Sequence, residues 1–436
     1  MFTYYLQLGF RSLRRNPALT ALMVMAIGFG VAASMITWSV FRAVSGNPIP
    51  DKSSQLFIPL IDNWGPQQND KGEPPEALDY VDAMALMHAR EAKRQTLLYM
   101  IQMSVMPAGD RDLPLPADGY AVGGDFFPMF EVPFQYGSGW SARDDQARGA
   151  EVVISDQLNQ KLFGGADSVG RTVNLSGHDY RVVGVTRHWN PSPRFFDLFS
   201  TSGFKEASDF YIPFTRALDL KMRPGGRNSC RGHLNFTGWE DYLQSNCVWI
   251  TAWVELDSAV EVTRYHRFLE SYAADQQRAG RFAWAPNVRL HNVTQWLDHE
   301  HVVPPESRIS LLVALGFFLI CLINTIGLLL AKFLRRAGEI GVRRALGASR
   351  REIYTQYLIE AGTVGLAGGV LGLLFTAVGV TGVGVLFPPQ IAKLAQLDFS
   401  LVGLTLLVAI VATVLAAFYP AWRAARVQPA WQLKSN

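Results

Sequence analysis

Four long stretches of the chain contain no charged residue, and they alternate with segments of mixed polarity. The stretches run over 16–41, 309–331, 361–392 and 399–422. A helix needs about 20 apolar residues to cross the roughly 30 Å hydrocarbon core of a bilayer. Buried helices of soluble proteins rarely run so long without a charge. We therefore predict four membrane spans, as helices over 17–45, 306–336, 351–387 and 399–422.

Basic residues flank these spans on one side. They precede the first span, crowd between the second and third, and follow the fourth: Arg11, Arg14, Arg15, Lys332, Arg335, Arg336, Arg343, Arg344, Arg350, Arg351, Arg423, Arg426 and Lys434. By the positive-inside rule, both termini and the middle basic loop are predicted to be cytoplasmic. The segment of about 265 residues between the first two spans then lies on the other side of the membrane.

Residues 1–16 are predicted to form an amphipathic helix on the inner leaflet, because apolar residues recur there at helical spacing. The alternative is a poorly ordered N-terminus. A second alternative treats the first span as a cleaved signal peptide. Its apolar stretch is longer than the roughly 7–15 residues of such a peptide, and cleavage would leave three spans with a basic C-terminus outside.

The long segment over 46–305 shows patterns of an α+β domain. Strands are predicted over 55–62, 96–106, 248–256 and 287–293, and helices over 75–90 and 258–278. These elements form two βαβ units, as in a ferredoxin-like split fold, around an insertion at about 107–246. Within the insertion, a strand over 152–155 leads into a helix capped by Ser155. A hairpin turning at Ser176-Gly177 follows it.

The basic loop over 337–350 is predicted to hold a short helix near 338–346 that ends at Gly347. Ser349 and Glu352 have the spacing of a capping box, so a new helix begins at Arg350 and continues into the third span. That helix would be about 55 Å long, more than a bilayer requires. A short helix between two span ends is a mechanical handle, because a partner that docks on it can push both spans.

The same loop carries a motif that resembles a known family. The run Glu339-x-Gly341-x-x-Arg344-Ala345-x-Gly347-Ala348, followed by Ile353, Glu360 and a glycine-rich span, resembles the signature of FtsX-like (MacB-like, type VII) ABC transporter permeases. The C-terminal run Tyr419-Pro420-Ala421 and the outer segment from Glu151 to Val185 are similar to the tail and the core external domain of this family.

This resemblance implies a fold class of membrane α plus extracytoplasmic α+β. Four transmembrane helices would carry a large periplasmic domain between helices 1 and 2, with porter-like split βαβ units and an inserted subdomain. It also implies a bacterial inner-membrane protein that acts in pairs, with a second copy or a paralogue. A cytoplasmic ABC ATPase dimer would bind the ATP, and this chain would hold no cofactor and catalyse no reaction. A periplasmic adaptor and an outer-membrane channel are further candidate partners, beside the lipid bilayer.

The functional hypothesis is mechanotransmission, in which ATPase motion moves the spans and the external domain to drive export or efflux from the periplasm. The candidate ATPase-coupling residues are Glu339, Gly341, Arg343, Arg344, Gly347 and Ala348. The alternative for these residues is a basic loop facing phospholipid. Lipoprotein extraction, control of a cell-wall hydrolase, and a membrane-anchored sensor or scaffold are alternative outputs. An intramembrane enzyme would need ionisable residues inside the apolar stretches, and the four stretches given above contain no charged residue.

Other residues give weaker indications of a disulfide, a phosphate-binding loop or a metal site. Cys230 and Cys247 lie in the outer segment. Two alternatives are kept for them, a disulfide or a pair of buried thiols. The run 165–172 is one residue away from a phosphate-binding loop, but a predicted helix precedes it and a strand follows it, the reverse of the required order. The run 298–301, Asp-His-Glu-His, is interpreted as a solvated linker, with a structural metal site as the alternative. We place no catalytic triad.

Composition agrees with this division. The chain is 49% hydrophobic and 18% charged, and its mean hydropathy is only +0.10. That value averages four apolar spans with a polar outer domain, and it excludes a disordered, collagen-like or disulfide-scaffold protein. The net charge of +3 is too small to indicate a nucleic-acid partner.

Overall fold

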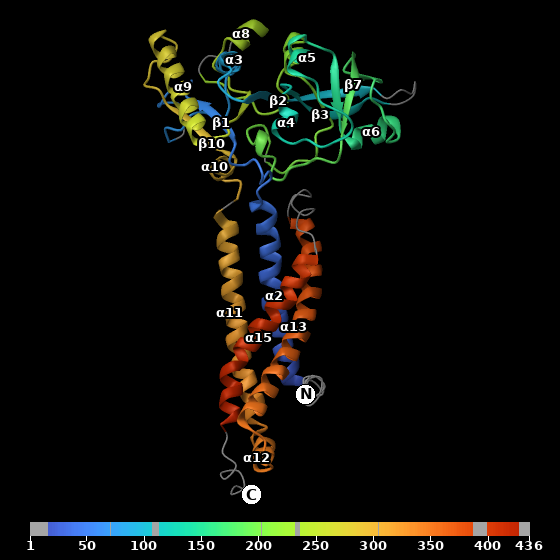
Figure 1. Ribbon diagram of the computed structural model, residues 1–436, viewed down its shortest axis with the longest axis vertical. Coiled ribbons are helices and arrows are strands. Elements are labelled where there is room, and N and C mark those ends of the chain that lie inside the picture. Colours follow the sequence, from blue (N-terminus) through green and yellow to red (C-terminus); the bar gives the residue numbers. More distant parts are fainter. Residues whose placement is uncertain are drawn as a thin grey trace. The chain divides into compact units, whose positions relative to one another are not determined.

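Figure 1 shows the computed structural model, which describes residues 16–69, 71–106, 113–201, 203–231, 236–303, 305–386 and 399–426. The chain divides into two compact units. The outer domain is Gly46–Val302, and the membrane unit contains the remaining described residues. The helix predicted over 1–16, apart from Asn16, lies outside the described residues, as does most of the tail predicted over 423–436.

The membrane unit contains four long helices and one short one among its described residues. They are α2 (Pro17–Ser45), α11 (Pro305–Leu334), α12 (Ala337–Ala345), α13 (Arg350–Leu386) and α15 (Phe399–Ala425). The four long helices have the length and apolar composition to cross a membrane. The last of them continues three residues beyond the predicted end at 422, because Arg423 to Ala425 keep helical geometry.

Glycines let α13 lie close against its neighbours. A Cβ atom added at Gly368 would come within 2.7 Å of the Ile27 side chain of α2, and one at Gly365 within 2.9 Å of the Ala409 carbonyl oxygen of α15. Such small-residue contacts replace the hydrophobic driving force that helices lack inside lipid. The helix α11 is the least covered of the four within this chain.

The outer domain is built on one mixed sheet of ten strands. They are β1 (Leu56–Ile61), β2 (Arg94–Met106), β3 (Leu115–Val122), β4 (Phe134–Gly137), β5 (Glu151–Ile154), β6 (Thr172–Leu175), β7 (His178–Thr186), β8 (Phe210–Pro213), β9 (Thr251–Glu255) and β10 (Val288–Asn292). Their order is β10–β1–β9–β2–β3–β8–β5–β7–β4, and β6 pairs with β2 and β7.

The described helices of this domain lie around the sheet (Figure 1). They are α3 (Tyr80–Ala89), α4 (Phe126–Met129), α5 (Ala142–Gln146), α6 (Asp156–Phe163), α7 (Phe214–Asp219), α8 (Trp239–Leu243), α9 (Ala259–Arg278), α10 (Val293–His299) and the 3₁₀ helix η1 (Phe195–Asp197). The units β1–α3–β2 and β9–α9–β10 interleave in the order β10–β1–β9–β2, antiparallel throughout. This is the split βαβ arrangement predicted from the sequence.

The long strand β2 joins this unit to the inserted segment. Its first residues, Arg94–Leu98, pair with β9, and Leu98–Val105 pair with β3. Alternate residues of the strand enter opposite cores, Leu97 and Tyr99 on one face and Leu98 and Met100 on the other. The insertion therefore continues the sheet of the split βαβ unit.

Local signals placed several elements correctly. Ser155 and Ser258 cap α6 and α9 by accepting hydrogen bonds from the backbone amides of Leu158 and Glu261. The β6–β7 hairpin turns at Ser176 and Gly177, whose φ values of 49° and 86° are both positive, as a tight two-residue turn requires.

One predicted helix begins later than expected. The helix predicted over 75–90 starts at Tyr80, because Asp79 caps it by accepting a hydrogen bond of 2.8 Å from the Asp82 amide. The preceding Leu78 is extended and pairs with Ile250. Apolar spacing alone does not reveal that the sheet holds this residue.

The run 165–172, considered as a phosphate-binding loop, and the run 298–301, considered as a metal site, have ordinary structural roles. The run 165–172 lies between helix α6 and strand β6, the order that disfavours a phosphate loop. His299 ends α10 and stacks on the rings of Trp296 and His291. Within the described ranges, no group of three or more His, Cys, Asp or Glu side chains is arranged to hold a metal ion.

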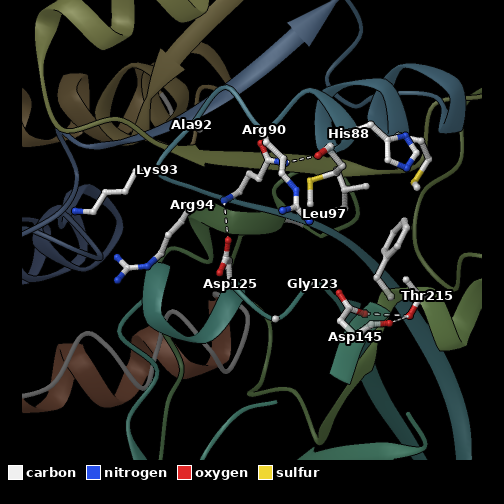
Figure 2. Close-up of a pocket in the computed structure, with 15 residues that line it drawn as sticks. His88, Arg90, Ala92, Lys93, Arg94, Leu97, Gly123, Asp125, Asp145 and Thr215 are labelled. Carbon is white, nitrogen blue, oxygen red and sulfur yellow. Dashed lines mark hydrogen bonds between the residues drawn. The ribbon is translucent and has the colours of Figure 1, made fainter. Parts of the chain in front are cut away.

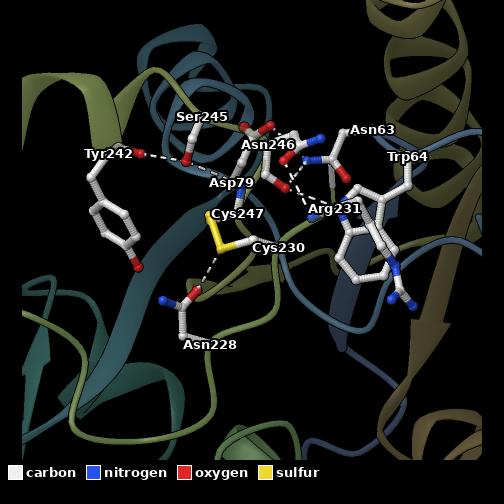
Figure 3. Close-up of a disulfide and its surroundings, with 10 residues drawn as sticks. All are labelled: Asn63, Trp64, Asp79, Asn228, Cys230, Arg231, Tyr242, Ser245, Asn246 and Cys247. Carbon is white, nitrogen blue, oxygen red and sulfur yellow. Dashed lines mark hydrogen bonds between the residues drawn. A yellow bond between two sulfur atoms is a disulfide. The ribbon is translucent and has the colours of Figure 1, made fainter. Parts of the chain in front are cut away.

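A disulfide joins Cys230 to Cys247 and closes a loop with a sequence separation of 17 (Figure 3). Ser229 and Val248, which neighbour the two cysteines, also exchange backbone hydrogen bonds. Nearby, the Trp64 indole donates to the Asn246 carbonyl oxygen over 2.9 Å, and the Arg231 guanidinium lies over the Trp64 ring. The disulfide thus fixes an irregular segment against the split βαβ unit.

We predict that replacing both cysteines by serine lowers the free energy of unfolding of the outer domain by about 3 kcal/mol, because the unfolded loop is no longer closed. The apparent Tm would fall by roughly 6–12 °C, measured by tryptophan fluorescence on the purified chain. Cys321→Ser, which leaves the disulfide intact, is the control. An unchanged Tm, or two free thiols in the oxidised protein, would contradict this prediction.

Candidate coupling site between the second and third spans

The helix α12 connects the end of α11 to the start of α13 through two tight turns. Gly347 has a φ of +100°, a conformation that residues with a side chain rarely adopt. Two residues later, Ser349 and Glu352 form the capping box of α13. The Glu352 amide donates to the Ser349 hydroxyl over 3.2 Å, and the Ser349 amide donates to the Glu352 carboxylate over 2.9 Å. This geometry fixes where α13 begins.

A buried carboxylate joins the three helices at this site. Glu360 of α13 is only 2% exposed. The ammonium nitrogen of Lys332, in the last turn of α11, lies 3.0 Å from one of its oxygens. The Arg336 guanidinium, in the turn before α12, donates to both oxygens over 3.3 and 3.0 Å. We call Lys332, Arg336 and Glu360 the ion cluster.

Each member of the ion cluster depends on the others. Lys332 is fully buried and Arg336 is 12% exposed, so water does not solvate these charges. Charges buried in this way need ionic or hydrogen-bonded partners, and removing one partner costs about 3–5 kcal/mol because the remaining charge is left uncompensated. The ion cluster therefore makes the end of α11, the start of α12 and the third turn of α13 one mechanical unit.

Apolar contacts reinforce the same junction. Ile340 of α12 and Ile353 of α13 are both buried. The Phe333 and Tyr357 rings, from α11 and α13, have centroids 4.2 Å apart. The helix α12 therefore packs one face against the spans.

The predicted coupling residues divide between buried and surface positions. Gly341 is buried and Ala348 packs against the apolar core of the membrane unit. Glu339 and Arg343 form an i,i+4 ion pair of 2.8 Å at the surface, where Arg343 also donates to Gln356 of α13. Arg344 reaches the Ala425 carbonyl oxygen of α15.

Several residues of the site escaped the sequence analysis. Lys332 and Arg336 were noted only as basic flanks and Glu360 only as part of a motif. The available signal was a single acid at the edge of a long apolar span, which needs a partner. Val342 and Leu346, one helical turn apart, are 56% and 84% exposed, and nothing in the prediction singled them out.

The fold is that of a chain with four helices long and apolar enough to cross a membrane and one large α+β domain between the first two. Residues 20–265 match the MacB-like periplasmic core domain, and residues 311–429 match the FtsX-like permease C-terminal region. The chain belongs to the MacB-like, FtsX-type family of ABC transporter permeases. Its four apolar helices and periplasmic-type domain are those of a multi-pass inner-membrane protein.

The chain is also similar in sequence to named proteins of other bacteria. The chain is 27% identical over 323 residues to the pyoverdine export ATP-binding/permease protein PvdT of Pseudomonas aeruginosa, covering 72% of this chain and 42% of that protein. It is 23% identical over 381 residues to the macrolide export ATP-binding/permease protein MacB of Wolinella succinogenes, covering 85% and 52%. It is 26% identical over 427 residues to MacB of Nitrobacter winogradskyi, covering 97% and 58%. The chain thus spans about half the length of the curated relatives it matches.

Two solved structures are also similar. The periplasmic region of MacB from Actinobacillus actinomycetemcomitans aligns with 57% of this chain and 94% of its own, at 15% identity and a TM-score of 0.36. The extracellular domain of the transporter YknZ from Gram-positive bacteria aligns with 54% and 99%, at 14% identity and a TM-score of 0.33.

We predict that Glu360→Ala destabilises the membrane unit by about 3–5 kcal/mol, because it leaves two buried cations without their carboxylate. The measurement is the apparent Tm of the purified chain in detergent. The double variant Lys332→Met/Glu360→Met should recover part of the loss, since Arg336 can still reach the surface. Equal Tm values for the wild type and Glu360→Ala would contradict the role given to the ion cluster.

Proposed function

We propose that this chain is the membrane subunit of an export-type ABC complex and transmits ATPase-driven motion to its periplasmic domain. The observation that carries the proposal is the ion cluster. A force on α12 displaces Arg336, and because Glu360 binds both Arg336 and Lys332, the displacement passes to α13 and α11 together. A flexible linker at this position would absorb the motion.

Charge and connectivity support the proposed direction of transmission. The basic residues around α12 favour the cytoplasm, as do those at both termini. The chain enters the outer domain at Gly46 after α2 and leaves it at Val302 before α11. Movement of α11 at its basic end is therefore delivered through a rigid helix to a covalent connection with the outer domain. In this mechanism no substrate needs to pass between the four spans.

The surface of α12 suits an ATPase contact. Val342 and Leu346 project an exposed apolar pair, and the Glu339–Arg343 ion pair lies beside them. Exposed apolar side chains rimmed by polar groups are typical of protein–protein or membrane interaction sites. Gly347 supports this surface, because its left-handed backbone turns the chain sharply after Leu346. ATP would be bound and hydrolysed by the separate ATPase subunit.

A second permease copy, or a paralogue, would cover the exposed side of α11. Its apolar residues Leu312, Phe317 and Ile320 are 69%, 44% and 58% exposed within this chain. Asn324, a polar residue on the same span, is exposed as well. An amide inside a membrane favours a hydrogen bond to another helix, which a partner chain can supply.

Export or efflux from the periplasm is the output we propose, since PvdT and the MacB proteins are named for export. A periplasmic adaptor and an outer-membrane channel would complete such a pathway. Lipoprotein extraction and control of a cell-wall hydrolase would use the same transmission with another output. A membrane-anchored sensor or scaffold differs from all of these, because it would not depend on ATP hydrolysis.

The test of coupling uses Leu346→Asp together with Val342→Asp, which place charges in the proposed contact. We expect about tenfold weaker association with the co-expressed ATPase, and loss of the ATP hydrolysis that the permease stimulates. Affinity capture and a phosphate-release assay measure the two effects.

The matched control is Leu113→Asp, which changes an equally exposed leucine of the outer domain. It should leave both measurements at the wild-type level. Normal ATPase association with the α12 variant would exclude this surface as the docking site. If the chain performs its function in the membrane without any ATPase, a sensor or scaffold would be favoured.

A further inference from the structure

A cavity of about 400 Å³ opens in the outer domain between α3 of the split βαβ unit and the inserted segment (Figure 2). The first residues of β2 and the turn after β3 complete its wall, with α5 and the start of α7. Small-molecule sites usually have volumes of about 300–1,000 Å³, so this cavity is large enough for one ligand. It lies within the outer domain and is distinct from the α12 junction.

The inner wall of the cavity is apolar. Met84 and Met87 lie one turn apart on α3, Leu97 comes from β2, and Phe214 begins α7. Leu97 and Phe214 are buried and held in place, since the Phe214 ring packs edge-on against Tyr99. The two methionines are only partly buried, and their unbranched side chains adapt to different shapes.

The acidic residues that line the cavity already have partners. Asp125 accepts a hydrogen bond of 3.1 Å from the backbone amide of Gln95. Asp145 accepts one of 3.1 Å from the Thr215 hydroxyl. Burial also raises the pKa of Asp145, which works against its ionisation. Both carboxylates are thus held in position by bonds within the chain.

Two of the three Arg and Lys residues that line the cavity already have partners. One guanidinium nitrogen of Arg94 donates to both carboxylate oxygens of the buried Glu255, over 3.2 and 3.0 Å. Lys93 lies 2.7 Å from Asp257 and 3.4 Å from Glu255. Both side chains therefore have carboxylate partners that do not line the cavity.

The third of these basic residues is Arg90. It ends α3 in a left-handed conformation, with a φ of 52°, and its side chain is exposed at the cavity. Figure 2 shows Arg90 on one side of the opening and Asp145 on the other. Arg90 makes no hydrogen bond or ion pair with any residue in the described part of the chain. The neighbouring Glu91 does not line the cavity. Arg90 is therefore the one Arg or Lys side chain of this lining that has no carboxylate partner among the described residues.

We propose that this cavity binds an amphipathic anion, with an apolar body against Met84, Met87 and Phe214 and its carboxylate, sulfonate or phosphate on Arg90. An apolar pocket with one charged group at its mouth holds the body by burial and orients the ligand through the charge. The inference does not depend on coupling to an ATPase, and its test is carried out without one.

The test is protection from thiol labelling, on the full chain in phosphatidylcholine nanodiscs. Met87→Cys in a Cys321→Ser background places one free thiol in the cavity. Its reaction with a water-soluble maleimide is followed with and without naphthalenesulfonate, an apolar ring with one anionic group. We expect saturating naphthalenesulfonate to slow labelling at least about fivefold. Naphthylmethylammonium, the matched cation, should leave the rate unchanged.

Adding Arg90→Gln should weaken protection by about tenfold in probe concentration, as expected for loss of one charged hydrogen bond. Arg267→Gln, an exposed arginine on α9, is the matched control and should keep full protection. Thr294→Cys, on α10 outside the cavity, should show no protection. If Met87→Cys does not fold, Met84→Cys replaces it.

Equal protection by both probes, no protection by either, or full protection in Arg90→Gln would overturn the proposal. Nanodiscs containing phosphatidylglycerol distinguish two sources of the same chemistry. Slower labelling in the absence of probe would indicate a membrane lipid as the natural ligand. An unchanged rate would indicate a water-soluble one.

Discussion

The buried carboxylate of Glu360 imposes a constraint on the whole membrane unit. A charge removed from water at the edge of a span must be matched, and here two cations from other segments match it. Lys332 fixes the end of α11, and Arg336 fixes the turn that starts α12. Since both pairs share one acceptor, none of these helices can shift alone without exposing a buried charge. The glycines of α13 add close packing on α2 and α15, so the junction is connected by contacts to all four spans.

In the outer domain, too, one element holds separate parts of the structure together. The strand β2 belongs to both the split βαβ unit and the inserted sheet, so the two parts share a backbone ladder. The cavity of Figure 2 forms beside the first residues of this strand, where α3 and the insertion diverge. A ligand there would contact both parts at once. Occupancy of the cavity would then bias how α3 sits against the insertion.

Local chemistry explains which features could be predicted from the sequence. The four spans, the cap at Ser155 and the turn at Ser176-Gly177 depend on neighbouring residues, and each appears in the structure within a few residues of its expected place. The pairing of Glu360 with Lys332 depends on residues 28 positions apart, and spacing carries no signal for it. The start of α3 was misplaced for the same reason, because the distant Ile250 holds Leu78 in the sheet. The pairing of β2 with the distant β9 likewise requires the tertiary fold.

The most direct measurement of transmission follows the outer end of α11 during ATP turnover. Ser307→Cys, in the Cys321→Ser background, is labelled with a maleimide in nanodiscs that contain the complex with its ATPase. In the otherwise wild-type complex, ATP should change the labelling rate. In Glu360→Gln, with ATPase binding retained, ATP should leave the rate unchanged, because the junction no longer moves as one unit. An undiminished response to ATP in Glu360→Gln would contradict the account.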